Sequence, residues 1–323
     1  MKAILYDRYG SSEVLQLQEV NRPAVGDNDV LIRIRAAGVN PYDWRFMRGT
    51  PYFMRLIIGL LKPRDGRLGA ELAGEVEAVG KNVTQFKPGE AVFGRVNGSF
   101  AEYISIPETD AIAPKPVNLS FEQAASVPLA ALTALQGLRD HGQIQPGQQV
   151  LINGASGGVG TFAVQLAKAF GAEVTGICST QNLELVRSIG ADKVIDYTRE
   201  DFTQSGQQYE LMLDMVGNHS LRDCTHILTT KGRYVVGSGP EGSGLLGPLG
   251  HLIKSLLMSP FVSQKVVSLD MKKNKADLLF LKTLIEAERI TPVIDRSYPL
   301  SEAPEAIRYL EKGHARGKVV MTM

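Results

Sequence analysis

The chain has 323 residues, of which 44% are hydrophobic and 21% are charged. Since this length exceeds what a single core usually holds, we expect two domains, and the composition argues against disorder. The 35 Lys and Arg against 34 Asp and Glu leave a formal net charge of +1, which gives no bulk electrostatic reason to bind nucleic acid or an anionic membrane surface.

The N-terminal residues 1–7 predict a first strand, because no long apolar run or Arg/Ser-rich stretch suggests a targeting segment. The most hydrophobic stretches, residues 53–61 and 245–262, are short or broken by Gly, Pro and Lys. A membrane-spanning helix needs about 20 apolar residues. We therefore expect a cytoplasmic protein with no integral membrane segment. Two cysteines, Cys178 and Cys224, are too few for a disulfide framework or a four-thiolate zinc site.

The first 120 residues consist of short apolar runs separated by Gly, Pro and Asn. Residues 30–36 and 101–106 alternate as half-buried strands do, and further strands are expected at 73–79 and 91–94. Residues 87–90, Lys-Pro-Gly-Glu, predict a tight turn between them. This pattern indicates a compact, barrel-like β domain.

Near residue 120 the pattern changes. Ser120 to Gln123 suggest a helix start, with an Ala/Leu-rich helix running through Leu138. Strands and helices then alternate: we expect strands at 150–152, 173–178, 193–195, 211–215 and 234–236, and helices at 162–170, 183–189 and 221–228. Such alternation predicts βαβ units and a parallel sheet. A helix is expected at 275–288, before a last strand at 318–321 that resembles the first region. We therefore expect the β domain to be discontinuous in sequence.

A glycine cluster lies between the strand at 150–152 and the next helix, with the sequence Gly-Ala-Ser-Gly-Gly-Val-Gly over residues 154–160. Gly157 and Gly158 would let the backbone approach phosphate oxygens, and Gly160 would let helix and strand pack closely. The helix N-terminus would add free N–H groups and partial positive charge. Glycines that merely serve tight turns would not explain their clustering after this one strand. We predict a dinucleotide site here, with Ala155 replacing the first glycine of G-x-G-x-x-G.

The tip of the following strand bears on the choice of nicotinamide cofactor. A carboxylate there would bind a ribose 2′-hydroxyl and repel a 2′-phosphate. Residues 176–182 instead contain small hydroxyl and amide side chains and no acid, which favours NADPH over NADH, although no Lys or Arg lies in the loop. Tyr197 and Arg199 could close over the phosphate from the next strand, or they could belong to a solvated turn.

Nearly the whole chain resembles the medium-chain dehydrogenase/reductase superfamily. It is most similar to the zinc-independent quinone oxidoreductase and enone reductase branch, which includes chloroplast-envelope-type quinone oxidoreductase homologues. The matching motifs lie in order at residues 37–44, 74–80, 87–94, 154–160, 190–192 and 317–320. The resemblance implies an α/β fold in which a GroES-like β-barrel domain, residues 1–121 and 290–323, is joined to a Rossmann domain with a doubly wound parallel sheet, residues 122–289. It also implies an active site in the cleft between the two and, more weakly, a homodimer.

The resemblance further implies roles for individual residues. Asn40 would bond the nicotinamide ribose or carboxamide, Thr133 would lie beneath the nicotinamide, and Lys318 would lie near the cofactor unless it is a solvated lysine at the end of the chain. The pyrophosphate would be held by Ser156, Gly157, Gly158 and Val159. The 2′-phosphate would face Ser179, Thr180 and Tyr197. The adenosine and nicotinamide halves would be flanked by Val216, Gly217, Gly237 and Ser238.

No metal site is expected. In zinc-dependent relatives a cysteine ligand takes the position of Asn40 and a His-Glu pair takes that of Ala70 and Glu71, so the three-ligand site of catalytic zinc does not assemble here. The four-cysteine structural lobe is missing, and the five histidines have no ligand spacing. Without a Lewis acid to ionise an alcohol, alcohol oxidation is disfavoured. Hydride transfer from NADPH to a small quinone or enone fits better, because the substrate's own carbonyl absorbs the charge.

The proton donor is left open by the sequence. Tyr42 and Tyr52 are candidates that could equally be packing groups, Asp43 could do no more than cap a helix, and solvent could supply the proton. The apolar segments 51–61 and 245–262 are expected to pack at the domain interface, or alternatively to cover a hydrophobic substrate or contact a partner subunit or membrane. Two other functions stay open: an enoyl-thioester reductase, and a nucleotide-binding protein without significant turnover.

Overall fold

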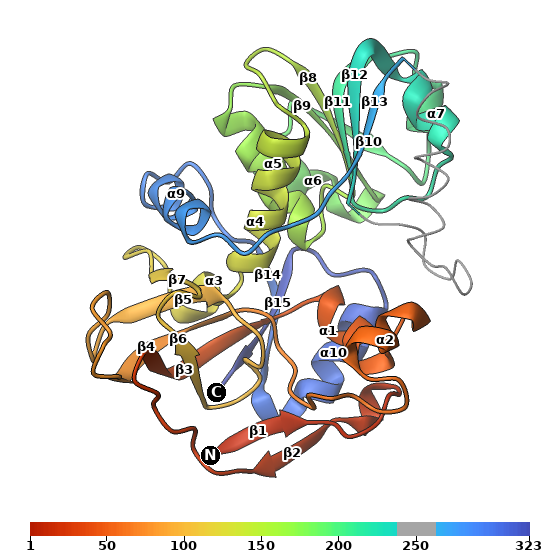
Figure 1. Cartoon of the computed structure of the whole chain (residues 1–323). Coiled ribbons are helices and arrows are strands. Elements are labelled where there is room, and N and C mark those ends of the chain that lie inside the picture. The colour runs from red at the N-terminus through yellow and green to blue at the C-terminus, as the bar shows by residue number, and fades with distance from the viewer. Residues whose placement is uncertain (238–262) are drawn as a thin grey trace. The chain divides into compact units, whose positions relative to one another are not determined.

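The computed structural model describes residues 1–237 and 263–323. These residues form two compact units (Figure 1). Unit 1 contains Met1–Leu132, Lys273–Glu288 and Pro292–Met323, and unit 2 contains Thr133–Lys272 and Arg289–Thr291. The β domain is therefore discontinuous, as its closing strand suggested. The sequence-based boundaries at 121/122 and 289/290 differ from this division because residues 122–132 and 273–288 belong to unit 1 and residues 290–291 to unit 2.

Unit 1 is built on a seven-stranded sheet in the order β14-β15-β3-β4-β5-β7, with β6 also paired to β3. A separate antiparallel pair joins β1 to β2. The strands are β1 (Lys2–Leu5), β2 (Gln16–Glu19), β3 (Asp29–Val39), β4 (Leu72–Val79), β5 (Ala91–Arg95), β6 (Tyr103–Pro107), β7 (Ala111–Pro114), β14 (Ile294–Pro299) and β15 (Lys318–Thr322). The helices are α1 (Pro41–Arg48), α2 (Arg55–Ile58), α3 (Phe121–Ala125), α9 (Lys275–Glu286) and α10 (Ala303–Glu311).

Strand β3 organises this unit because it pairs with β4, β6 and β15. Its alternating pattern buries Val30, Ile32 and Ile34 in one core cluster, while Arg33 is exposed on the other side. Its far end, toward Val39, pairs with β15 and lies in a second cluster, which also contains the buried face of α10.

Helix α9 belongs to unit 1, although the sequence assigned residues 275–288 to the Rossmann domain. Leu278, Leu281 and Ile285 are fully buried, and the helix packs against β7. The Glu286 carboxylate accepts the backbone N–H of Val117 at 3.0 Å, and the Ile285 carbonyl accepts the side-chain amide of Asn118 at 2.9 Å. A periodic apolar face shows that a helix packs but does not say which sheet it packs on.

The helix expected over 120–138 is interrupted. Ser120 caps α3 by accepting the N–H of Gln123, and a second helix, α4 (Pro128–Gln136), begins at Pro128. Proline suits the first turn of a helix but not its interior, which explains the break. A π-helical turn at Gly137–His141 follows α4.

Unit 2 contains a six-stranded, entirely parallel sheet in the order β10-β9-β8-β11-β12-β13 (Figure 1). Counted along the chain, this is the order 3-2-1-4-5-6 of Rossmann domains. Its strands are β8 (Gln149–Asn153), β9 (Glu173–Cys178), β10 (Lys193–Asp196), β11 (Tyr209–Asp214), β12 (Leu228–Val236) and β13 (Lys265–Ser268), and its helices are α5 (Gly158–Ala169), α6 (Leu183–Ser188) and α7 (Leu221–His226). The strand order changes direction at β8, because β9 and β10 lie on one side of it and β11, β12 and β13 on the other. The loop after β8 therefore lies at the switch point where nucleotides bind.

Of the helices that the structure describes, none is long and apolar enough to cross a membrane. Segment 51–61 contains the short helix α2, and several of its apolar side chains are open to solvent. Leu56, Ile57, Leu60 and Leu61 are 63–88% exposed. The second apolar segment, 245–262, lies outside the described residues.

Candidate functional site

The glycine loop after β8 leads directly into helix α5. Gly157 is the N-cap residue, and no side chain caps the helix. The backbone N–H groups of the first turn are therefore not taken by a side-chain cap, and an uncapped helix N-terminus of this kind can bind phosphate. Gly158 and Val159 form this first turn, while Ser156 lies in the loop before it.

Two glycines of the loop have different tasks. A Cβ at Gly160 would lie 2.0 Å from the Gly154 carbonyl oxygen, so only glycine lets α5 approach the loop. A Cβ at Gly157 would meet only the Gly154 carbonyl, at 3.4 Å, which is an ordinary contact. Gly157 therefore leaves open space for a ligand rather than for protein packing.

Asn182 ties this loop to the tip of β9. Its side-chain Nδ2 donates to Ser156 Oγ and to Ser179 Oγ, each at 3.1 Å. Its Oδ1 is buried and has no hydrogen-bond partner among the described residues. A buried acceptor without a donor is uncommon in native structures, and a ribose hydroxyl is a donor of the right kind. The loop and Asn182 together fit a dinucleotide.

An acid lies beside the tip of β9 after all. Thr180 Oγ1 donates to Asp196 Oδ2 at 2.5 Å, and Thr198 donates to Asp196 Oδ1 through its hydroxyl at 2.7 Å and its N–H at 3.0 Å. These hydroxyl hydrogen bonds, that of Thr180 first, lower the pKa of Asp196. The sequence missed Asp196 because it ends the next strand, β10, whose parallel pairing brings Asp196 opposite Cys178.

The two residues expected to close over a 2′-phosphate are both open to solvent. Tyr197 is 53% exposed, and the Arg199 side chain is 73% exposed with Nε 3.4 Å from Asp196 Oδ2. Arg199 thus supplies the positive charge that the β9 loop lacks, at the cost of sharing it with Asp196.

A second polar anchor shapes the loop after β11. Buried Asp214 accepts the N–H groups of Val216 and Gly217 through Oδ1, at 3.0 and 2.9 Å, and the Tyr234 hydroxyl through Oδ2 at 2.7 Å. This fixes Val216 and Gly217 at the carboxyl end of the sheet. Gly237 follows the end of β12, whereas Ser238 lies outside the described residues. Thr133 lies on α4 and is 8% exposed.

A buried ionic cluster occupies unit 1 and is made by Asn40, Glu71 and Lys318, which we call the Lys318 cluster. Lys318 Nζ lies 2.5 Å from Asn40 Oδ1 and 2.7 Å from Glu71 Oε1. The Asn40 amide donates to the same Glu71 oxygen at 2.8 Å, and the N–H of Leu129 donates to Glu71 Oε2 at 2.6 Å. The exposed fractions of the Lys318 and Glu71 side chains are 3% and 0%, so Lys318 is not a solvated lysine at the end of the chain.

The backbone is fitted to this cluster. A Cβ at Gly38 would lie 2.1 Å from Glu71 Oε1, so glycine is required where β3 passes the carboxylate. Asp43, at the third position of α1, accepts the N–H of Asn40 at 2.8 Å and that of Gly69 at 3.2 Å. Asp43 therefore does cap α1, and it also fixes Asn40. Burial raises the pKa of Asp43 from 3.8 to about 7, against the opposing effect of the Asn40 N–H.

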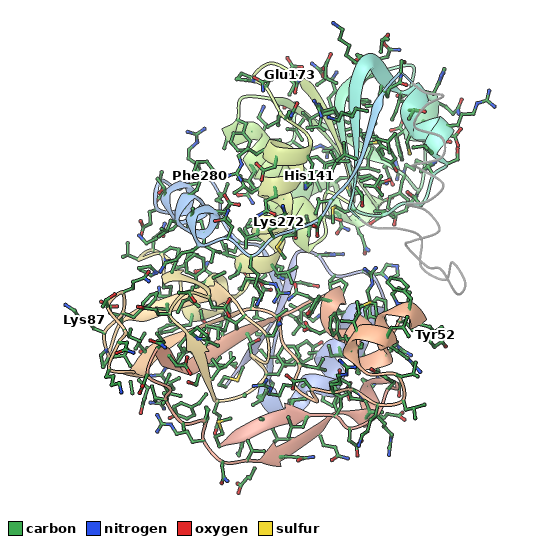
Figure 2. All side chains as sticks on the ribbon, viewed as in Figure 1. Tyr52, Lys87, His141, Glu173, Lys272 and Phe280 are labelled. Carbon is green, nitrogen blue, oxygen red and sulfur yellow. The ribbon has the colours of Figure 1, made fainter. Side chains whose placement is uncertain are left out.

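The two tyrosine candidates have different surroundings. Tyr42 is half-buried, with its ring 4.2 Å from that of Phe46 and 4.8 Å from the guanidinium carbon of Arg95. Tyr52 is 55% exposed, and Figure 2 shows it at the surface beside α2. Arg95 was not singled out by the sequence, since one arginine at a strand end carries no spacing signal.

This chain is similar to known proteins in both sequence and structure. A family model described as an alcohol dehydrogenase GroES-like domain matches residues 26–117, and one described as a zinc-binding dehydrogenase matches residues 189–321. The mouse protein named mitochondrial NAD(P)H oxidoreductase RTN4IP1 is 34% identical over 100% of this chain and 89% of its own. An Arabidopsis thaliana protein named chloroplastic NADPH-dependent alkenal/one oxidoreductase is 34% identical over 99% of this chain and 79% of its own.

The solved structure of the quinone oxidoreductase from Coxiella burnetii has a TM-score of 0.87 and 32% identity, covering 100% of this chain and 99% of that one. The fold and the nucleotide loop define a two-domain oxidoreductase with a GroES-like and a Rossmann unit. The chain belongs to the medium-chain dehydrogenase/reductase superfamily, as its sequence motifs predicted.

Proposed function

We propose that this protein is an NADPH-dependent, zinc-free reductase of quinones or α,β-unsaturated carbonyl compounds. The position of the Lys318 ammonium is the main support for this proposal. The ammonium of Lys318 lies between Asn40 and Glu71, two of the three positions at which the family resemblance places metal ligands. Its positive charge fits an oxidoreductase whose substrate is already an activated electrophile, so that no metal is needed to ionise an alcohol.

The donor set does not fit zinc. Asn40 Oδ1 and Glu71 Oε1 already accept hydrogen bonds from the Lys318 ammonium, and a second cation there would be repelled. Within the described ranges, no group of three or more His, Cys, Asp or Glu residues is arranged to hold a metal ion. Elemental analysis of the purified protein should find zinc well below one atom per chain, and chelation should leave turnover unchanged. Stoichiometric zinc whose removal abolishes turnover would overturn the proposal.

A nicotinamide nucleotide, when bound, supplies the hydride. The first turn of α5 at Gly158 and Val159, with Ser156 and Gly157 in the loop, would bind the pyrophosphate. Ser179, Thr180 and Tyr197 would face the adenosine ribose and its 2′-phosphate. Asn40, Thr133 and Lys318, with Val216, Gly217, Gly237 and Ser238, keep the cofactor-binding roles that the resemblance implies.

The preference for NADPH over NADH is supported by the occupied state of Asp196. Its carboxylate oxygens accept hydrogen bonds from Thr180 and Thr198, so they are less available to bind a ribose 2′-hydroxyl, and the positive charge of Arg199 lies close by and opposes the negative charge of Asp196. Dissociation constants for NADPH and NADH should therefore differ in favour of NADPH. Equal or tighter NADH binding would contradict this.

A variant tests the same argument. Thr180→Ala frees one Asp196 oxygen, so the ratio of NADPH to NADH affinity should fall. Thr203→Ala is a matched control, because Thr203 Oγ1 donates to Asp201 at 2.7 Å in the same way but at a different place on unit 2. An unchanged ratio in Thr180→Ala, or an equal fall in the control, would refute the role assigned to Asp196.

Substrate class is tested by mixing the protein and NADPH with quinones, enones and enoyl thioesters and following the absorbance of the reduced cofactor. Faster consumption with enoyl thioesters would favour that reductase instead. Cofactor binding with no consumption across the panel would favour a nucleotide-binding protein without significant turnover. The homodimer stays a prediction, and so does the cytoplasmic location, since the two relatives named above carry mitochondrial and chloroplastic names.

A further inference from the structure

Arg95 is a buried cation at the end of a strand. It is the last residue of β5 and is 4% exposed. Its Nη1 donates to the carbonyl oxygens of Ala70 at 2.6 Å and Val96 at 2.9 Å, and to Asn97 Oδ1 at 3.0 Å. Its Nε is buried with no hydrogen-bond partner among the described residues, and its charge lowers the pKa of the nearby Asp43 carboxyl group. Because burying a charge is costly, an arginine that keeps one donor unsatisfied is suited to stabilise negative charge that develops beside it.

The group beside it is Tyr42. The Tyr42 ring lies 4.2 Å from the Phe46 ring and 4.8 Å from the guanidinium carbon of Arg95, so both residues help to position it. Burial raises the pKa of the Tyr42 phenol, and the charge and hydrogen bond of Arg95 oppose that rise. Arg95 therefore makes the phenol a stronger acid than burial alone would allow.

The pair adjoins the Lys318 cluster through the chain itself. Tyr42 lies two residues after Asn40, and the carbonyl that anchors Arg95 belongs to Ala70, next to Glu71. Tyr42 is thus close in sequence to Asn40, and Arg95 is hydrogen-bonded to Ala70, so both adjoin positions at which zinc-dependent relatives hold their metal. A positive charge in this region can oppose negative charge on a substrate oxygen.

We propose that the Tyr42 hydroxyl is the proton donor of the reaction and that Arg95 is the positioning residue that activates it. This inference rests on the proposed function. Hydride addition to the β-carbon of an enone moves the C=C electron pair toward the carbonyl oxygen and gives an enolate. The Tyr42 O–H bond breaks, its proton passes to that oxygen, and the resulting enol becomes the ketone. The phenolate keeps the O–H electron pair beside Arg95 until water returns a proton.

The test compares Tyr42→Phe, Arg95→Gln and Arg95→Lys with wild type for kcat, KM and their pH dependence. A matched control is Tyr103→Phe, because the guanidinium of Arg22 also stacks on the Tyr103 ring, at 4.0 Å, on strand β6. NADPH affinity and thermal unfolding are measured for each variant. The other titratable groups that interact with Tyr42 are Asp43 and Tyr6, and the pKa of Asp43, about 7, lies below the alkaline range at issue.

Tyr42→Phe is expected to lower kcat at least about 30-fold and to abolish the alkaline fall of the rate, with NADPH affinity unchanged, since general acids typically contribute ~10²–10⁴-fold. Arg95→Gln should lower kcat and move the alkaline limb to higher pH, and Arg95→Lys should recover part of both. Tyr103→Phe should behave as wild type.

A loss of kcat smaller than five-fold in Tyr42→Phe, or an alkaline limb retained in that variant, overturns the inference and makes solvent the proton source. If Arg95→Gln does not fold, the Tyr42→Phe result alone decides. In these outcomes the wild-type protein still reduces its substrate, so only the inference about Tyr42 is wrong. If the wild-type protein reduces no member of the substrate panel, the proposed function is wrong and the inference with it.

Discussion

Replacing Lys318 by methionine should destabilise unit 1 strongly. The substitution keeps the length and apolar part of the side chain but removes the ammonium from between Asn40 and Glu71. Glu71 would then retain two neutral donors, the Asn40 amide and the Leu129 N–H, and no counter-charge. Removing one partner of a buried ion pair typically costs about 3–5 kcal/mol, because an uncompensated charge stays buried.

The size of the effect in a melting experiment follows from the size of the unit. For a domain of roughly 150–250 residues, each kcal/mol lowers the melting temperature by about 2–4 °C, so Lys318→Met should lower it by about 6–20 °C. Lys282→Met is the matched control. Lys282 Nζ lies 2.6 Å from Glu286 Oε2, yet both side chains are partly exposed, so its loss should cost no more than about 1 kcal/mol.

Calorimetry or urea unfolding would measure both variants, together with Glu71→Gln and Lys318→Met/Glu71→Gln. The double variant removes the stranded charge and should be more stable than Lys318→Met alone. If Lys318→Met loses less than about 1 kcal/mol, or if the double variant is as unstable as the sum of the single ones, the Lys318 cluster is not an ion pair that stabilises the fold.

Three further predictions concern pH, the cofactor and packing. Burial raises the pKa of Asp43 to about 7, so its proton is held more tightly in the folded state than in the unfolded state. As the pH rises from about 4 to about 7, wild type should therefore lose stability relative to Asp43→Asn. Urea unfolding midpoints measure this, and a difference between the two proteins that stays constant with pH would contradict it. Gly157→Ala should keep the wild-type melting temperature, since its Cβ finds room, yet bind NADPH about ten-fold or more weakly; unchanged affinity would move the pyrophosphate elsewhere. Gly160→Ala should instead lower the stability itself, by about 1–3 kcal/mol or more, because its Cβ meets the Gly154 carbonyl; an unchanged melting temperature would refute the close approach.

The sequence predicted the parallel half of the fold well because each of its strands is short, apolar and separated by a helical segment. The strand expected at 173–178 coincides with β9, and the helix expected at 162–170 begins earlier, at Gly158, because its first turn is glycine-rich rather than apolar. The helix expected to run through residue 138 failed at Pro128, where a proline signal was present but was outweighed by the Ala/Leu run.

The candidate site was harder to predict because its key contacts are long-range. Local spacing identified the glycine loop, but no spacing rule joins Asn40, Glu71 and Lys318, or Thr180 and Asp196. The pairing of strands that are distant in sequence brings such residues together, and this pairing can be seen only in the three-dimensional structure. The sequence left open whether Lys318 lies near the cofactor or in solvent. In the structure Lys318 is buried and hydrogen-bonded to Asn40 and Glu71.

The separation of the Lys318 cluster along the chain has a consequence during synthesis. Lys318 follows Asn40 by 278 positions and Glu71 by 247, and it enters the sheet on β15, between β14 and β3. A ribosome making the chain from its N-terminus delivers the carboxylate long before the ammonium that neutralises it. Glu71 therefore gains its counter-charge only after the nucleotide-binding unit between the two residues has been made, and a chain truncated before Lys318 would lack that counter-charge.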